Sequence, residues 1–207
     1  MTNDIGAFWD ERFSAKEYIY GTEPNEYVKE QLEKLKPGRI LFAAEGEGRN
    51  AVYAATKSWD VVAFDPSKAG KQKALQLAAS KNVEIAYHIT DVVNADFTLE
   101  SFDAVVLVYA HFHESVRREY HRKLANYVKS GGYIILEGFS KEHQENQKKN
   151  PKAGGPKNSE MLYTLKELKK DFEDFELILS KQTSTELKEG DYHVGKADVI
   201  RILAKKN

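Results

Sequence analysis

The chain has 207 residues, no cysteine, 41% hydrophobic residues and a formal net charge of −1. That length and apolar content suffice for one domain with a full core, and the lack of cysteine excludes disulfides, thiolate nucleophiles and cysteine-ligated zinc. The near-neutral charge predicts no nucleic-acid partner. Because the chain starts with a polar, acidic segment and has no apolar run of spanning length, the sequence predicts a cytoplasmic protein with no membrane partner.

From residue 39 onward, short apolar runs alternate with longer charged stretches of helical periodicity, the pattern of a parallel α/β sheet. The near-continuous hydrophobicity of the runs is typical of strands covered on both faces. The predicted strands are residues 39–44, 60–65, 84–90, 102–110 and 133–139. The predicted helices are residues 50–57, 67–81 and 115–129, with Gly131 and Gly132 expected to end the last of them.

The composition changes after residue 139. Residues 141–160 are rich in Gly, Pro, Asn and Lys and are expected to form a long exposed loop, which at that length is either disordered or functional. A capping box of Thr164 and Glu167 then predicts a helix. Residues 175–187 and 193–206 read as strands joined by a short turn, which predicts an antiparallel pair. The expected α/β fold therefore has five βα units followed by a β-hairpin.

The most informative motif is the turn after the first strand, GEGRNA, at residues 46–51. Ligands of an open α/β sheet bind at the carboxyl ends of the strands, and Gly46 and Gly48 allow the backbone to approach a ligand closely. The helix that begins near Asn50 is expected to present unpaired N–H groups there. Asp65, at the end of the second strand, is placed to accept hydrogen bonds from a ribose. We therefore expect a nucleoside cofactor at this turn.

Two cofactor classes are compatible with this turn. GEGRNA satisfies the G-x-G-x-x-G/A pattern of dinucleotide-binding proteins, so an NAD(P)-dependent oxidoreductase is one alternative. Glu45 and Glu47, however, place negative charge where a pyrophosphate would lie. Such charge favours a cationic amino or sulfonium group over a pyrophosphate.

The segments AEGEGRN, VVAFD, ITDV, VYAHF and KSGGYIILEGF, in this order, resemble class I S-adenosylmethionine-dependent methyltransferases. The opening FWDERFSAKEYIYGTEPNEYV is similar to the entry segment of the tellurite-resistance TehB and thiopurine S-methyltransferase-like branch. The resemblance covers nearly the whole chain. It implies a Rossmann-like, seven-stranded, mostly parallel sheet with a terminal antiparallel β-hairpin and helices on both faces.

The same resemblance implies one methyltransferase domain over residues 1–207 and S-adenosylmethionine as its cofactor. The domain divides into an N-terminal lid segment (1–30), a cofactor-binding core (38–140), a substrate-side loop (141–160), and a helix with the terminal hairpin (161–207). The partner it implies is a small-molecule methyl acceptor. The oligomeric state stays open.

The resemblance also implies roles for individual residues, from their positions in the matching motifs. Asp65 matches the family's ribose-binding acid and Pro66 the residue that packs near the adenine, while Asp91 and Val92 match the pair that binds the adenine edge. For Asp91, a helix cap or turn former is the alternative. Tyr109 and Ala110 are expected beneath the methionine and methyl end of the cofactor. The full set of implied cofactor-binding residues is Trp9, Arg12, Tyr20, Ala44, Glu45, Gly46, Gly48, Asn50, Asp65, Pro66, Asp91, Val92 and Tyr109.

The first motif departs from the family, because Phe42 and Ala44 stand where an acid and a glycine are usual. That acid commonly helps to hold the amino group of the cofactor's methionine. We hypothesise that Glu45 or Glu47 replaces it, the alternative being that both acids are solvated turn residues.

Trp9, Arg12, Tyr18 and Tyr20 lie in a segment with too few periodic apolar residues to be core alone. The related enzymes fold this region over the cofactor as a lid. A guanidinium matches a carboxylate as a fork, so Arg12 is expected to pair with the methionine carboxylate. Trp9 either faces the cofactor or substrate or packs a helix against the sheet.

His111, His113 and Glu114 follow the fourth strand, where this fold places substrate-facing residues. No third ligand is marked by the spacing, so no metal site is predicted. His111 is the predicted catalytic residue, as base or polar contact at the transfer centre, and His113 is expected to cap the next helix. Two further histidines, His88 and His121, are expected to be structural. The candidates for the acceptor pocket are Glu137, His143 and His193.

Methyl transfer from a sulfonium is an in-line displacement, so the protein mainly aligns the reactants and excludes water. A thiolate or a selenium or tellurium oxyanion needs little help from a base, whereas oxygen and nitrogen acceptors more often need one. Because the sequence marks no single compelling base, it favours a soft, small acceptor. Two alternatives remain: an NAD(P)-dependent oxidoreductase and a non-catalytic S-adenosylmethionine-binding protein.

Overall fold

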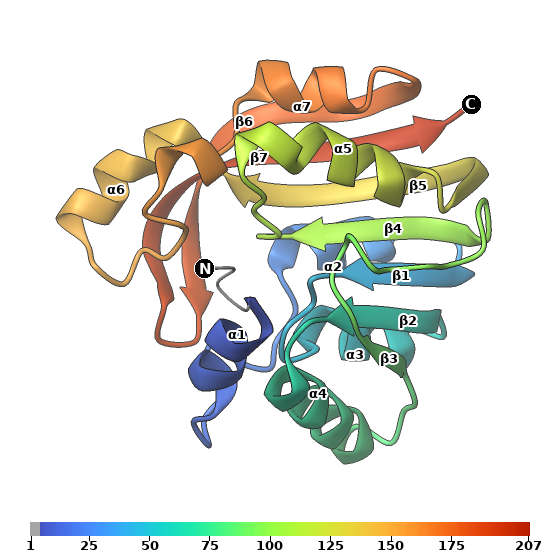
Figure 1. Cartoon of the computed structure of the whole chain (residues 1–207), viewed down its shortest axis with the longest axis horizontal. Coiled ribbons are helices and arrows are strands. Elements are labelled where there is room, and N and C mark those ends of the chain that lie inside the picture. Colours follow the sequence, from blue (N-terminus) through green and yellow to red (C-terminus); the bar gives the residue numbers. More distant parts are fainter. Residues whose placement is uncertain (1–4) are drawn as a thin grey trace.

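The computed structural model describes residues 5–207, which form a seven-stranded sheet of order β3-β2-β1-β4-β5-β7-β6 (Figure 1). The strands are β1 (Arg39–Ala43), β2 (Asp60–Asp65), β3 (Ala86–Ile89), β4 (Phe102–Val108), β5 (Val128–Phe139), β6 (Phe175–Glu189) and β7 (His193–Lys206). Neighbours among the first five strands pair parallel, whereas β7 pairs antiparallel with both β5 and β6. The predicted sheet with its terminal antiparallel hairpin is confirmed.

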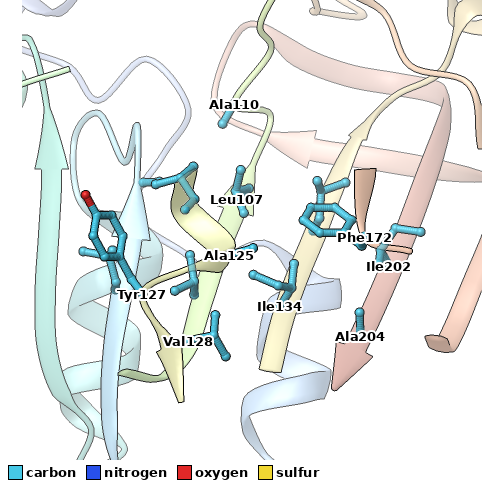
Figure 2. Packing of buried hydrophobic residues seen from close by; sticks show 14 of the residues in the cluster. Leu107, Ala110, Ala125, Tyr127, Val128, Ile134, Phe172, Ile202 and Ala204 are labelled. Atoms are coloured by element: carbon cyan, nitrogen blue, oxygen red, sulfur yellow. The ribbon is translucent and has the colours of Figure 1, made fainter. Parts of the chain in front are cut away.

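Helices cover both faces of this sheet. They are α1 (Ile5–Phe13), α2 (Glu26–Leu32), α3 (Arg49–Thr56), α4 (Lys68–Ser80), α5 (Glu114–Ala125), α6 (Gln144–Lys149) and α7 (Leu165–Asp171). On one face, Leu107 of β4 and Ile134 of β5 pack with Phe172, which follows α7 (Figure 2). On the other face, Ile40 of β1 packs with Tyr27 of α2. Burial on both faces explains why the central strands are apolar along their whole length.

One predicted boundary is wrong. The helix expected over residues 115–129 ends at Ala125, and β5 already begins at Val128 and runs through Gly131 and Gly132. The fully buried Val128 is core of the sheet, not the end of a helix. The glycines lie where the register between β4 and β5 shifts, and Gly131 has a φ of 78°. An irregularity in a strand and a helix end both favour glycine, so the local pattern did not distinguish them.

The prediction of a long exposed loop over residues 141–160 is wrong for residues 141–149, which are helical, whereas residues 150–158 form a loop. The segment contains α6 between two short 3-10 turns. Its polar side chains bond to backbone: the Gln147 amide donates to the carbonyl of Gly154 at 2.7 Å, and the Asn150 amide donates to the carbonyl of Val194 in β7 at 2.7 Å. Polar residues that suggest solvent exposure in the sequence thus anchor this segment against the hairpin.

The hairpin of β6 and β7 extends beyond the ends of the other strands and curves toward α1 (Figure 1). Its tip lies against the N-terminal segment. The Asp191 N–H donates to the Ile19 carbonyl at 3.3 Å. At Gly190, with a φ of 58°, a Cβ atom would lie 2.2 Å from that same carbonyl oxygen. The segment around Ile19 and the hairpin tip therefore meet beside the carboxyl ends of the strands.

Gly48 sets the distance between the turn before α3 and α4. It has a φ of 85°, and a Cβ atom there would lie 2.4 Å from Cβ of Ala74. We expect Gly48→Ala to lower the free energy of unfolding by about 3–5 kcal/mol, because backbone strain and overpacking add.

Gly131→Ala is the matched control for this prediction. Gly131 has a similar φ of 78° with no atom within 4 Å of the added Cβ, so only the strain of about 1–3 kcal/mol is expected. Denaturant unfolding measures both variants. Equal losses would contradict the close approach of the turn to α4.

Candidate functional site

The glycine turn after β1 is bound to the buried carboxylate of Asp65 at the end of β2. Asp65 Oδ2 accepts the Gly46 N–H at 3.1 Å, and Oδ1 accepts the Ser67 N–H at 2.9 Å. The Tyr87 hydroxyl donates to the Gly46 carbonyl at 2.6 Å. Burial outweighs the hydrogen bonds and raises the pKa of Asp65 to about 6. The turn and the acid that the sequence singled out therefore lie in contact.

Glu45 caps the start of α3. Its Oε1 accepts the N–H groups of Asn50 and Ala51, both at 2.8 Å. Burial raises the pKa of this carboxyl to about 7, against the effect of these hydrogen bonds and of Arg49. These are the N–H groups that the sequence predicts to be open to a ligand. The structure corrects that expectation, because Glu45 already occupies them.

Glu47 is buried and joins the turn to two other segments. Its Oε1 accepts from Nζ of Lys73 in α4 at 2.7 Å, and its Oε2 accepts the Ile19 N–H at 2.8 Å. The Lys73 ammonium also donates to the Glu17 carbonyl at 2.7 Å. Glu47 is therefore not a solvated turn residue, and its charge is already paired.

The two departures in the first motif have separate structural explanations. Phe42, where the family has an acid, is fully buried in the cluster that contains Tyr27 of α2. Ala44, where the family has a glycine, has a φ of 53°. The turn therefore keeps a left-handed conformation that glycine adopts at least cost.

The N-terminal segment covers the glycine turn. Phe13 of α1 packs against Gly46, where an added Cβ would lie 3.0 Å from Cζ of its ring. Trp9 stacks on Phe13, with ring centroids 5.3 Å apart and an interplanar angle of 20°. Asp10 accepts from the Ser67 hydroxyl at 2.7 Å, which docks α1 on the start of α4. The predicted lid extends over residues 1–30, of which residues 1–4 lie outside the described part of the chain.

Arg12 and Tyr20 point toward the tip of the hairpin. The Arg12 guanidinium lies 4.6 Å from the ring centroid of Tyr192 and 5.9 Å from that of Tyr20. Its buried Nε has no hydrogen-bond partner among the described residues. The pairing of Arg12 with the methionine carboxylate stays a prediction.

The predicted adenine-edge pair follows β3. Asp91 Oδ1 accepts the backbone N–H of Asn94 at 2.8 Å and its side-chain amide at 2.9 Å. Asp91 thus forms a turn, the alternative that the sequence left open, while Val92 is buried in the core. Pro66 follows Asp65 directly, next to the start of α4.

Both ring nitrogens of His111 are bonded to backbone groups, so its predicted catalytic role stays a prediction. Its Nε2 accepts the Phe139 N–H at 3.1 Å, so its Nδ1 carries the proton that is donated to the Met161 carbonyl at 2.8 Å. Burial lowers the pKa of the ring to about 3. His111 is therefore a bridge between backbone groups. His113 caps α5 as predicted, and His121 is fully buried and bonded to Asp171 at 2.8 Å.

A buried polar network joins the ends of β4 and β5 to the hairpin. Glu137 accepts from the Tyr109 hydroxyl at 2.9 Å and from the Asn25 amide at 2.7 Å. Glu189 accepts from Arg49 at 2.8 Å and lies 2.9 Å from His193 Nδ1. Although burial alone would raise it, Arg49 and His193 hold the pKa of Glu189 at about 2. Tyr109 has a φ of 52°, a strained conformation typical of functional sites.

Three residues of this network are not predicted from the sequence: Asn25, Arg49 and Glu189. No local pattern marks Asn25 or Arg49, since their partners are distant in sequence. Glu189 and His193 are a cross-strand pair of the hairpin. The short turn predicted between these two strands is the signal in the sequence that places Glu189 and His193 side by side.

Two negative findings apply to residues 5–207. In this part of the chain, no group of three or more His, Cys, Asp or Glu side chains is arranged to hold a metal ion. The helices of the same residues include none with the length and apolar character needed to span a membrane.

The raised pKa of Glu45 predicts a pH dependence of stability. Its carboxyl keeps its proton in the folded state up to about pH 7 but loses it near its ordinary pKa of 4.5 in the unfolded state. The folded state therefore binds more protons in this window, and stability falls as the pH rises through it. Glu45→Gln keeps an acceptor for the α3 N–H groups and removes the titration.

Accordingly, we expect Glu45→Gln to gain stability relative to wild type between pH 4.5 and 7, by on the order of 1–2 kcal/mol. Thermal and denaturant unfolding across this range measures the difference. Glu33→Gln, on the surface, is the control and should show no such trend. A constant difference between Glu45→Gln and wild type would contradict the raised pKa.

Comparisons with known proteins agree with this geometry. Residues 40–132, just under half of the chain, match the model of a methyltransferase domain. No curated protein sequence matches the chain.

Similar solved structures share the fold. One, described as converting a disulfide bond into a thioacetal group during echinomycin biosynthesis, is 17% identical with a TM-score of 0.77, over 98% of this chain and 90% of that one. TehB from Haemophilus influenzae is 17% identical with a TM-score of 0.71, over 98% of this chain and 67% of that one. Magnesium protoporphyrin IX methyltransferase from Synechocystis PCC 6803, with bound S-adenosylhomocysteine, is 14% identical with a TM-score of 0.68, over 99% of this chain and 95% of that one.

At these identities the likeness to solved structures establishes the fold alone. The match over residues 40–132 includes β1, β2, β3 and β4 and the glycine turn with its Asp65 contact. Residues 40–132 therefore match a methyltransferase domain, and this match supports an enzyme that transfers methyl groups.

Proposed function

We propose that the chain is an S-adenosylmethionine-dependent methyltransferase of the TehB and thiopurine S-methyltransferase-like branch, acting on a small-molecule acceptor. A thiol or a selenium or tellurium oxyanion is the acceptor class. The observation that carries the cofactor assignment is the set of carboxylates at the glycine turn, where Glu45 occupies the first N–H groups of α3.

A pyrophosphate needs free N–H groups at the start of a helix and suffers from nearby negative charge. The turn does not suit a pyrophosphate on either count. Glu45 already occupies the N–H groups at the start of α3, and Asp65 adds a second carboxyl beside the turn. Both carboxyls have a raised pKa. A cation beside them stabilises their ionised forms. The ammonium and sulfonium groups of S-adenosylmethionine supply that charge, whereas NAD(P) supplies the opposite.

The parts of the domain take distinct roles in this proposal. The core, residues 38–140, binds the cofactor, with Asp65 at the ribose, and the lid segment of residues 1–30 closes over it. Because Phe13 lies against Gly46, cofactor entry requires α1 to move away from the turn. Residues 141–160 bound the acceptor side, and residues 161–207 complete the sheet.

Aromatic rings line the acceptor side and support a small acceptor. Tyr109 stacks on Phe139 with centroids 4.4 Å apart, and His193 lies 4.4 Å from Tyr20. The hairpin tip and the N-terminal segment meet over these rings. Aromatic packing of this kind excludes water, and the alignment of two small reactants away from water is the main requirement of an in-line methyl transfer.

Ligand binding tests the proposed function directly. Isothermal titration calorimetry and thermal shift with S-adenosylmethionine, S-adenosylhomocysteine, NAD and NADP should show binding and a raised melting temperature with the first pair alone. Binding of a dinucleotide only would overturn the proposal in favour of an oxidoreductase. Binding of S-adenosylmethionine without methyl transfer to any acceptor would favour a non-catalytic binding protein.

Asp65→Asn should weaken binding of S-adenosylhomocysteine by about 10- to 100-fold, as expected for the loss of a charge-assisted hydrogen bond. Asp60→Asn, at the opposite end of the same strand with an exposed side chain, is the matched control and should bind normally. Calorimetry with thermal unfolding of each variant separates lost binding from lost folding. Unchanged affinity in a folded Asp65→Asn would refute the ribose contact.

A further inference from the structure

We propose that His193, held in place by Glu189, takes the proton from a thiol acceptor as the methyl group is transferred. This inference rests on the proposed function and names a catalytic residue and an acceptor class for the same site. It replaces the base role predicted for His111, whose two ring nitrogens are both bonded to backbone.

The pair with Glu189 fixes the tautomer of His193. Nδ1 of the ring lies 2.9 Å from Oε2 of Glu189. Glu189 is ionised at neutral pH, because its pKa is about 2, and an ionised carboxylate only accepts hydrogen bonds. Nδ1 of His193 therefore carries the proton, and Nε2 of the neutral ring presents a lone pair. Across the described residues, Nε2 has no hydrogen-bond partner.

Close packing surrounds the Nε2 edge of His193. Gly154, which has a φ of 80°, lies against this edge: an added Cβ atom there would lie 2.9 Å from Nε2 and 2.2 Å from Cδ2, so any side chain at this position would block the ring. The ring lies 4.6 Å from that of Tyr109 and 4.4 Å from that of Tyr20. Tyr109 directly follows β4, at the position proposed for the methyl end of the cofactor. The lone pair thus lies on the acceptor side of the transfer centre.

Charges around the ring favour a neutral imidazole that can accept a proton. Burial lowers the pKa of His193, Arg49 and Arg12 lower it further, and Glu189 opposes them. The other titratable groups that face this region are Tyr20, Tyr109, His111, His143 and Tyr192. Burial also lowers the pKa values of His111 and His143, so these rings add no positive charge at neutral pH.

The proposed step balances with one proton acceptor and no other reactant. The thiol proton moves to Nε2 of His193, and a sulfur lone pair forms the new bond to the methyl carbon. The bond from this carbon to the sulfonium breaks, and its electron pair stays on the sulfur of S-adenosylhomocysteine. The proton on His193 then leaves to water. A thiol with a pKa of about 8–9 lies within reach of a neutral imidazole, whereas a tellurium oxyanion has no need of one.

The test compares two thiols that differ in the need for a base. At pH 7, 4-nitrothiophenol is already a thiolate, whereas 2-mercaptoethanol is almost entirely a thiol. We expect His193→Gln to lower kcat/KM for 2-mercaptoethanol by about 10²–10⁴-fold, the usual contribution of general-base catalysis. The loss for 4-nitrothiophenol should stay below about 10-fold. Binding of S-adenosylhomocysteine, measured by calorimetry, should be unchanged.

Two further variants sharpen the comparison. His88→Gln, an exposed histidine on the edge strand β3, is the matched control and should leave both rates unchanged. Glu189→Gln tests the positioning residue and should reduce the rate for 2-mercaptoethanol selectively. Because Glu189 raises the pKa of His193, its loss should also lower the pH at which the remaining rate reaches half its maximum; an unchanged midpoint would show that the pair fixes only the tautomer.

Each outcome decides between the two proposals. Equal losses for both thiols in His193→Gln would overturn the proton-transfer role in favour of a structural one. Failure of the wild-type protein to methylate any thiol, while it still binds S-adenosylhomocysteine, would overturn the thiol acceptor and leave the proposed function intact. Failure to bind S-adenosylhomocysteine would instead overturn the proposed function.

Discussion

The Glu189 carboxylate is the interaction on which the geometry of the site depends. It binds Arg49 at the start of α3, Asn25 before α2, and His193 across the hairpin. Breaking such a buried pair leaves an uncompensated charge, although the intact pair adds little net stability over an apolar replacement. The Glu189–Arg49 pair therefore acts mainly by fixing the position of the hairpin tip, because the buried Arg49 guanidinium needs the Glu189 carboxylate beside it.

That constraint explains why β6 and β7 extend beyond the sheet. Strands that ended level with β5 would be long enough to complete the sheet. β6 and β7 instead continue past that level, until Glu189 contacts Arg49 and Gly190 contacts Ile19. The N-terminal segment is held from the other side by Glu47, through Lys73 and the Ile19 N–H. Two buried carboxylates, from a turn and a hairpin, thus hold the N-terminal segment and the hairpin tip over one edge of the sheet.

The sequence predicts the sheet well because its information is local. Apolar runs and the βα alternation identify every strand, and the cap at Thr164 identifies α7. Residues 141–149 are wrongly assigned to a loop because some of their polar side chains, such as that of Gln147, bond to backbone within the fold. At the site, Asp65 and Gly46 are predicted from a motif, whereas the pairing of Arg49 with Glu189 depends on contacts 140 residues apart in sequence. No pattern within one element carries that information.

His111 and His193 show why residue type and position alone do not identify a catalytic base. Burial lowers the pKa of both rings, and both lie beside Phe139. The difference lies in what each nitrogen contacts. At His111 the Phe139 N–H occupies Nε2, so this lone pair is already used. At His193 the carboxylate occupies the protonated Nδ1 and leaves the other nitrogen as an acceptor. His111 thus bridges two backbone groups, whereas His193 keeps one ring nitrogen for a proton.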